Sequence, residues 1–348
     1  MAGNLVLITG VSGHIGFRVL RYALEYGYQV RAAVRSEEKA NIVRNNAVLK
    51  AMGKDSQLSF TIIPDFSAAN AFDEAAKGAK YVIHVASPLA TRAPADGDYQ
   101  KGFIDPAVNM TLSMLDAARK AGSIKRVVIT SSVVAIMPIT AMFEPSGEVY
   151  TADTRVDELT GPLENPMAGY VASKIAAFNR AEAWIKNEKP AFDVIHVHPS
   201  FVEGRDDLCD STEYFLTSTN ALIVRQALGM PSYFPAAPNN YNHVDDSARI
   251  HVQALDPHVE GNQSFVVSNN GEDGMQWSDV AKHVRQHFPE AVEKGILPLG
   301  GELASVITKL DNSKTEKTFG KLATFEECVV SVMGHWLELY DKEHALKN

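Results

Sequence analysis

The chain has 348 residues, of which 45% are hydrophobic and 22% charged, and its 33 basic and 42 acidic side chains give a net charge of −9. This composition excludes a disordered tail, a collagen-like repeat and a disulfide-rich scaffold. An acidic surface repels phosphate backbones, so we expect no nucleic-acid partner. The length favours one large α/β domain that carries a smaller second lobe.

The two cysteines, Cys209 and Cys328, lie far apart and match neither a metal-binding spacing nor a disulfide framework. The first residues form a short apolar run without a basic leader, and no apolar stretch reaches 18 residues, which predicts neither a signal peptide nor a transmembrane helix. We therefore expect a cytoplasmic protein without a membrane partner. His283 and His287 have the spacing of zinc ligands, but no third ligand is evident, so we predict an exposed helix face and no metal.

Short β-rich runs alternate with longer stretches of helical periodicity through the first 200 residues. Strands separated by such helices cannot pair as hairpins, so they need right-handed crossovers and form a parallel sheet. The predicted strands are 5–9, 29–34, 58–63, 81–85, 126–130 and 192–197, and the predicted helices are 14–26, 36–52, 98–121, 168–186 and 324–340.

Near-continuous apolar runs in these strands are typical of a sheet that is buried on both faces. The fold class is therefore α/β, with a doubly wound parallel sheet. The pattern becomes richer in turn-forming residues after Pro199, with three prolines between residues 231 and 238. We predict a sheet domain of residues 1–199 and 240–270, and a smaller, discontinuous C-terminal substrate lobe of residues 200–239 and 271–348.

A glycine loop joins the first predicted strand to the first predicted helix, and it reads Thr-Gly-Val-Ser-Gly-His-Ile-Gly. Such a loop binds the pyrophosphate of a dinucleotide: one glycine permits the sharp turn, one lets the backbone approach the phosphates, and one lets helix and strand pack closely. Its first gap is one residue longer than in the usual G-x-G-x-x-G. The expected cofactor contacts are Gly10, Ser12, Gly13, His14, Ile15 and Gly16.

The end of the second predicted strand indicates which dinucleotide binds. An NAD site usually has an acidic residue there for the ribose hydroxyl, whereas this chain has Arg35, followed one helical turn later by Lys39. Two cations suit a 2′-phosphate, so we predict NADPH/NADP. Asp65 and Phe66 follow the third strand. They are candidates for contacts to adenine or, equally, for an ordinary helix start.

Tyr170 and Lys174 stand four residues apart on a predicted helix, which places both side chains on one face. A neighbouring ammonium lowers the pKa of a phenol, so Tyr170 is a candidate general acid and Lys174 its partner and a ligand of the nicotinamide ribose. Ser132 ends the fifth predicted strand, where a hydroxyl would polarise a carbonyl group. Ser131 and Thr130 are alternatives for that hydroxyl.

The glycine loop, the strand-end Ser132 and the Tyr-x-x-x-Lys motif occur in an order that resembles the extended short-chain dehydrogenases/reductases with their Rossmann fold. Val-Arg-Ala-Ala-Val-Arg-Ser-Glu-Glu-Lys, His84-Val-Ala-Ser-Pro88 and Tyr-Val-Ala-Ser-Lys resemble their dihydroflavonol reductase-like branch, which includes plant flavonoid reductases and fungal aldehyde and ketone reductases. The resemblance covers nearly the whole chain. It implies cofactor contacts for Ala86, Ser87, Pro88, Pro199, Ser200 and Val202.

The resemblance also implies a structural or proton-relay role for Asn109, and a helix-capping role for Asp245 and Asp246 in His243-Val-Asp-Asp-Ser-Ala248. The chain departs from the family pattern at Met110, where a glycine is usual, and at Val133-Val134, where several relatives have smaller or aromatic residues. The second departure alters the pocket wall, so the substrate cannot be transferred from relatives. The expected pocket walls are Leu89, Val133, Val134, Met137, Met167 and Phe201.

The sequence thus predicts an NADPH-dependent carbonyl reductase, a monomer or homodimer, that acts on a neutral, hydrophobic ketone or aldehyde such as an aromatic ketone, a diketone or a polyketide. One alternative is an NAD-dependent nucleotide-sugar epimerase or dehydratase, which often has Tyr-Gly-x-Ser-Lys. Val171 and Arg35 argue against it. The other alternative is a redox-sensing regulator that binds the dinucleotide without chemistry. Such regulators commonly lose the tyrosine or lysine that this chain keeps.

Overall fold

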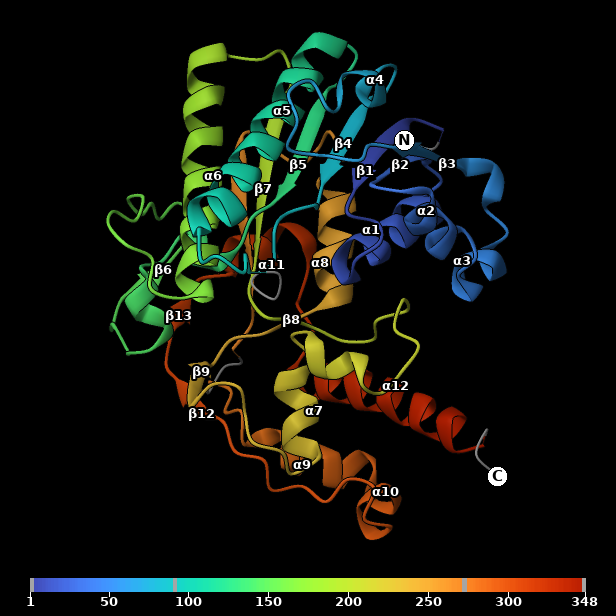
Figure 1. Ribbon diagram of the computed structural model, residues 1–348, viewed down its shortest axis with the longest axis vertical. Helices are drawn as coiled ribbons and strands as arrows, with labels where there is room; N and C mark the ends of the chain where they lie inside the picture. Colours follow the sequence, from blue (N-terminus) through green and yellow to red (C-terminus); the bar gives the residue numbers. More distant parts are fainter. Residues whose placement is uncertain (1–2, 90–92, 271–273, 346–348) are drawn as a thin grey trace.

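The computed structural model describes residues 3–89, 93–270 and 274–345, and its centre is a seven-stranded, entirely parallel sheet (Figure 1). The strand order is β3-β2-β1-β4-β5-β7-β11, which confirms the predicted doubly wound fold. The strands are β1 (Leu5–Thr9), β2 (Gln29–Val34), β3 (Leu58–Ile62), β4 (Tyr81–His84), β5 (Arg126–Thr130), β7 (Asp193–Pro199) and β11 (Gln263–Val267).

Helices cover both faces of this sheet because alternate residues of each strand carry apolar side chains to opposite faces. One core cluster joins Val6 and Ile8 of β1 to helices α1, α2 and α8, and another joins Leu7 of the same strand to α4, α5 and α6. These helices are α1 (His14–Glu25), α2 (Glu37–Arg44), α4 (Asp73–Ala76), α5 (Asp105–Ala121), α6 (Pro166–Glu188) and α8 (Val244–Gln253).

Two of the predicted helices are interrupted. The helix expected over 36–52 divides into α2 and α3 (Ala47–Met52), because the Asn46 side chain accepts a hydrogen bond from the Val48 N–H and so starts a new helix. The helix expected over 98–121 begins with a wider π-helical turn (Gln100–Ile104) before α5. Pro106, near the start of α5, has no N–H for the regular α-helical bond.

A second unit lies below the sheet in Figure 1 and has its own apolar core, which includes Trp277, Phe325 and Trp336. Among the described residues, four helices build it: α7 (Ala221–Ala227), α9 (Asp279–His287), α10 (Pro289–Glu293) and α12 (Phe325–Ala345). The described part of the chain also contains three two-stranded parallel sheets. They are β8 (Val202–Glu203) with β10 (Asn242–His243), β9 (Ala236–Pro238) with β12 (Ala304–Val306), and β6 (Val149–Tyr150) with β13 (Lys309–Leu310).

One helix departs from the predicted lobe of residues 271–348. In α11 (Ser313–Phe319), Thr315 donates a hydrogen bond to the Val266 carbonyl at 2.6 Å, and Phe319 packs edge-on against Phe265 of β11. The chain therefore returns to the sheet here, where the half-buried Phe319 and the Thr315 hydrogen bond attach α11 to the last strand. None of the described helices is both long enough and apolar enough to cross a membrane.

Candidate active site

The sheet order reverses between β1 and β4, and a ligand crevice forms at such a point in doubly wound folds. Thr9 joins the two strand ends, because its hydroxyl accepts hydrogen bonds from the N–H groups of Val85 and Ala86 at 3.1 Å. Gly10 has a left-handed φ of +79°, and a Cβ there would lie 2.9 Å from the Ala86 nitrogen. The glycine loop thus lies directly against the end of β4.

The same loop packs closely on the start of α1. A Cβ at Gly16 would lie 2.0 Å from the Gly10 carbonyl oxygen, so no larger residue fits there. At Gly13, by contrast, a Cβ would meet only that oxygen, at 3.6 Å. Gly13 is the N-cap of α1 without a side-chain cap, and the first turn contains no acidic residue. The N–H groups and the positive end of the helix dipole therefore suit an anionic group such as a pyrophosphate.

The predicted 2′-phosphate ligands lie just beyond β2. Arg35 is exposed, with its guanidinium carbon 5.6 Å from the centroid of the Phe66 ring, and Lys39 lies in the first turn of α2. Phe66 is buried, and its ring packs against Phe72. Asp65 accepts hydrogen bonds from both the N–H and the hydroxyl of Ser67, which lower the pKa of its carboxyl group. One Asp65 oxygen therefore stabilises this turn.

Tyr170 and Lys174 lie in the second and third turns of α6. Asn165 caps this helix, because its side chain accepts a hydrogen bond from the Ala168 N–H at 2.9 Å, and Pro166 occupies the first helical position. The Lys174 ammonium is 5.7 Å from the centroid of the Tyr170 ring. Lys174 is buried and makes no hydrogen bond or ion pair among the described residues, which leaves its donors available to a ligand.

Burial controls the titration of this pair. It lowers the pKa of Lys174 to about 8, because a buried ammonium loses its hydration. It raises the pKa of Tyr170, and a hydrogen bond with Ser132 partly opposes that shift. The direction for Tyr170 is therefore opposite to the one expected from the sequence, where the ammonium alone was considered. In the structure, loss of hydration has the largest effect on the pKa of this phenol.

The structure separates the three candidate hydroxyls at the end of β5. Ser132 hydrogen-bonds Tyr170, and its hydroxyl also lies 3.5 Å from the Pro199 carbonyl oxygen. Thr130 bonds His251 instead, at 2.7 Å. The Ser131 hydroxyl is buried without a partner among the described residues. Ser132 is therefore the hydroxyl beside the tyrosine.

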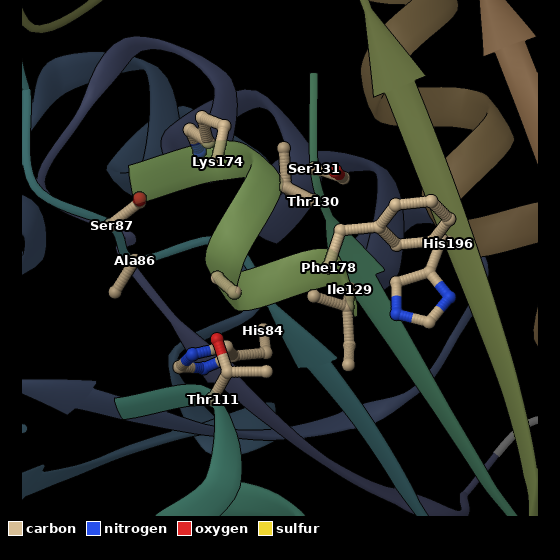
Figure 2. A pocket seen from close by; sticks show the side chains of 11 residues that line it. His84, Ala86, Ser87, Thr111, Ile129, Thr130, Ser131, Lys174, Phe178 and His196 are labelled. Atoms are coloured by element: carbon tan, nitrogen blue, oxygen red, sulfur yellow. The ribbon is translucent and has the colours of Figure 1, made fainter. Parts of the chain in front are cut away.

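A small cavity of about 20 Å³ lies beside Lys174, which is room for about one water molecule (Figure 2). Its polar lining includes Ser131 and His196, which each have a buried polar atom without a partner in the described part of the chain. Two predicted cofactor contacts, Ala86 and Ser87, also line it. The complete lining is His84, Ala86, Ser87, Thr111, Ile129, Thr130, Ser131, Lys174, Ala177, Phe178 and His196.

Four of the predicted pocket walls gather around Tyr170 in one apolar cluster. Val133, Val134 and Met137 are buried there, and Met167 packs against them from the start of α6. The other two expected walls lie outside this cluster. Leu89 is 52% exposed, and Phe201 packs edge-on against Trp277 in the core of the second unit.

Asn109 is wrongly predicted as a relay or structural residue of the site. Its side chain is exposed on α5, whereas Thr111 is buried and lines the cavity. The predicted capping role of Asp245 and Asp246 is wrong, because His243 caps α8: its Nδ1 accepts a hydrogen bond from the Asp245 N–H at 3.1 Å. The two carboxylates lie in the first turn, where each forms an ion pair with an arginine instead. The remaining family-implied contacts follow β7: Pro199 ends the strand, Ser200 is half-buried and Val202 is buried in β8.

His283 and His287 both lie close to Glu326 of α12, and the closer contact, from His287, measures 2.5 Å. Among the described residues, no group of three or more histidine, cysteine or acidic side chains is arranged to hold a metal ion. The sequence reasoning did not single out His84, His196 or His198, which are buried around the site. The His-x-His spacing of the last two, on one face of a strand, was the available signal.

The profile of the NAD-dependent epimerase/dehydratase family matches residues 6–268 of the chain. The chain belongs to this family. The resemblance to extended short-chain dehydrogenases/reductases is thereby confirmed. Ketoreductase CTB6 of Cercospora beticola is 44% identical to this family member over 100% of the chain and 99% of that protein. Ketoreductase sphI of Aspergillus fumigatus is 31% identical, over 97% of the chain and 99% of that protein.

A solved structure shares the fold over nearly the whole length of this family member. The yeast methylglyoxal/isovaleraldehyde reductase Gre2, in complex with NADPH, covers 97% of the chain and 99% of its own, with a TM-score of 0.79 at 23% identity. The doubly wound sheet and the helices around it are therefore an arrangement that a reductase also adopts.

Proposed function

We propose that the protein is an NADPH-dependent carbonyl reductase that transfers hydride to a ketone or aldehyde of a neutral, hydrophobic small molecule. The observation that carries this proposal is the cluster of Tyr170, Ser132 and Lys174, close to the crevice between the ends of β1 and β4. The relatives named as ketoreductases support the same class of reaction.

The bound nicotinamide would supply the hydride, and with it the electron pair that forms the new C–H bond. Tyr170 then donates its phenolic proton to the carbonyl oxygen, which completes the alcohol and leaves a phenolate. Ser132 donates a hydrogen bond to the same oxygen and holds it beside the phenol. Because burial raises the pKa of Tyr170, the phenol keeps its proton until negative charge develops on the substrate oxygen.

Lys174 has two tasks in this proposal. Its ammonium stabilises the phenolate after proton transfer, and it binds the ribose hydroxyls next to the nicotinamide. The absence of other polar partners among the described residues supports both, since the buried ammonium needs hydrogen-bond acceptors from a ligand.

Cofactor choice follows from the residues after β2. Arg35 and Lys39 present two positive charges where an NAD enzyme has a carboxylate, so they bind the 2′-phosphate of NADPH. The expected adenine contacts, Asp65 and Phe66, remain proposals, with Phe66 acting through the arginine that covers its ring.

Apolar walls define the proposed substrate class. Val133, Val134, Met137 and Met167 share a cluster with Tyr170 and offer no charged partner to a substrate. A neutral, hydrophobic ketone or aldehyde suits these walls, because a charged substrate would lose its hydration without compensation.

The test is NADPH oxidation, followed by absorbance, with a panel of aromatic ketones, diketones, polyketide-like ketones and aldehydes. We expect turnover with several hydrophobic members and a clear preference for NADPH over NADH. Turnover of nucleotide sugars with a cofactor that stays bound would support the epimerase alternative instead. Tight NADPH binding without turnover of any carbonyl compound would support the regulator.

A further inference from the structure

Two buried histidines of β7 face the helix that carries Tyr170 and Lys174. His196 and His198 stand two residues apart, and both pack edge-on against Phe178 of α6, with ring centroids 4.9 and 4.8 Å away. Phe178 lies one helical turn after Lys174. The proposed reaction uses neither histidine.

Only His198 reaches the reaction site by a hydrogen bond. Its Nδ1 lies 3.2 Å from the main-chain carbonyl oxygen of Ser132. Because a carbonyl oxygen only accepts hydrogen bonds, Nδ1 carries the hydrogen and donates it. The ring is neutral, since burial and the facing charges of Arg155 and Lys174, together with His196, hold the pKa of His198 well below its usual value. His196 makes no such bond, and its Nε2 is buried without a partner in the described residues.

Ser132 is thereby held through its main chain from the neighbouring strand, because His198 bonds its carbonyl oxygen. The main chain of Ser132 is extended, with φ −164° and ψ 155°, and it caps the short 3₁₀ turn that follows. Rotation of this backbone would move the hydroxyl away from Tyr170.

We propose that His198 is a positioning residue for carbonyl reduction: its imidazole N–H fixes the main chain of Ser132, so that the serine hydroxyl stays directed at Tyr170. This inference rests on the proposed function. The simpler view, that His198 only fills space beneath α6, predicts equal effects at His196 and His198, because both rings pack in the same way against Phe178.

The experiment compares His198→Leu, His198→Asn and the matched control His196→Leu in the full chain, with NADPH and the best carbonyl compound of the panel. We expect His198→Leu to lower kcat about tenfold, with little change in the KM for NADPH, because one hydrogen bond to the site is lost. His198→Asn keeps an N–H donor near the position of Nδ1 and should recover most of kcat. His196→Leu removes a ring from the cavity wall beside Lys174 but no bond to Ser132, so it should lower kcat clearly less than His198→Leu.

The pH profile gives a readout that a space-filling role would not change. Reduction needs a protonated Tyr170 and the Lys174 ammonium beside it. We therefore expect kcat to fall first as Lys174, with a pKa of about 8, loses its proton, and again as the pH rises through the higher pKa of the Tyr170 phenol. The hydrogen bond from Ser132 lowers the pKa of the phenol, so its weakening in His198→Leu should move this second alkaline limb to higher pH. The limb should stay in place in His196→Leu.

Equal kcat and equal alkaline limbs in His198→Leu and His196→Leu would overturn this inference while the proposed function stands. A parental chain that reduces no carbonyl compound would overturn both. If His198→Leu does not fold, long-range ¹H–¹⁵N spectra of the parental protein decide the question, with His198→Asn for assignment. A hydrogen on Nδ1 supports the proposed bond, and a hydrogen on Nε2 with a bare Nδ1 contradicts it.

Discussion

The guanidinium of Arg35 lies over the buried ring of Phe66, 5.6 Å from its centroid, just where β2 ends. This cation–π contact with a buried ring restricts the arginine side chain, so its charge stays near the end of β2 although the side chain is exposed. This placement makes the choice between NADPH and NADH testable at a single side chain.

We expect Arg35→Ala to reduce the kcat/KM preference for NADPH over NADH by about 10- to 100-fold, the loss of one charge-assisted hydrogen bond to a phosphate. Arg44→Ala is the matched control, because Arg44 lies over the Phe60 ring in the same way but at the end of α2. An unchanged preference in Arg35→Ala would mean that other residues bind the 2′-phosphate.

Tyr170→Phe should lower turnover by at least ~100-fold while NADPH binds with nearly the parental Kd, because the substitution removes only the phenolic hydroxyl that donates the proton. Tyr150→Phe serves as the control. Tyr150 belongs to the same apolar cluster, but its hydroxyl bonds Ser146. Steady-state kinetics and fluorescence titration of NADPH measure the two quantities. Parental turnover in Tyr170→Phe would reject the phenol as the acid.

Two glycines of the loop allow stability and cofactor binding to be tested separately. Gly16→Ala forces a Cβ to within 2.0 Å of the Gly10 carbonyl oxygen, and we expect it to cost about 1–3 kcal/mol of stability or more. Gly13→Ala has room for the methyl group in the protein itself. It should keep the parental Tm and weaken NADPH binding, since the methyl group faces the proposed pyrophosphate site. Thermal unfolding and NADPH titration check both, and a parental Tm in Gly16→Ala would contradict the packing argument.

Glu203 of β8 gives a pH-dependent prediction. The side chain is fully buried and neither carboxyl oxygen has a partner in the described part of the chain, so burial raises its pKa well above 4.5. Above pH 4.5 the unfolded chain loses this proton while the folded chain keeps it, so this group lowers the stability as the pH rises. Glu203→Gln should therefore increase the free energy of unfolding by at least about 1 kcal/mol at pH 7–8 and have little effect at pH 4.

Denaturant unfolding at the two pH values measures this difference. The exposed Glu302→Gln provides the control, for which we expect no change at either pH. The same gain for Glu203→Gln at pH 4 and at pH 8 would show that titration of the buried carboxyl is not its cause.

Strands and their order of succession were predictable from sequence, because each strand of a doubly covered sheet is a short apolar run between turn residues. The proximity of Tyr170, Lys174 and Ser132 was predictable too, since one helix face and one strand end bring these positions together. The break of the predicted helix at Asn46 was harder to predict from the sequence. A single asparagine either continues a helix or starts a new one, and tertiary packing decides which.

The interior around the site could not be predicted. Asn109 and Thr111 lie two residues apart, which is about 200° around a helix, so only one of them can face the sheet. The sequence gives no independent measure of that rotation, and the family-implied choice was the exposed residue. The buried histidines His196 and His198 were missed for a related reason. Their polar rings interrupt the apolar pattern of β7, and only the structure shows what they touch.

The return of α11 to the sheet limits how chimeras can be built to exchange substrate specificity between related chains. The second unit is not one removable insert, because the chain leaves it to pack Phe319 on Phe265 and then re-enters it as α12. A chimera that transplants everything after residue 270 would also replace a helix that packs on the seven-stranded sheet. Grafting must therefore proceed by separate segments, with Ser313–Phe319 kept from the recipient.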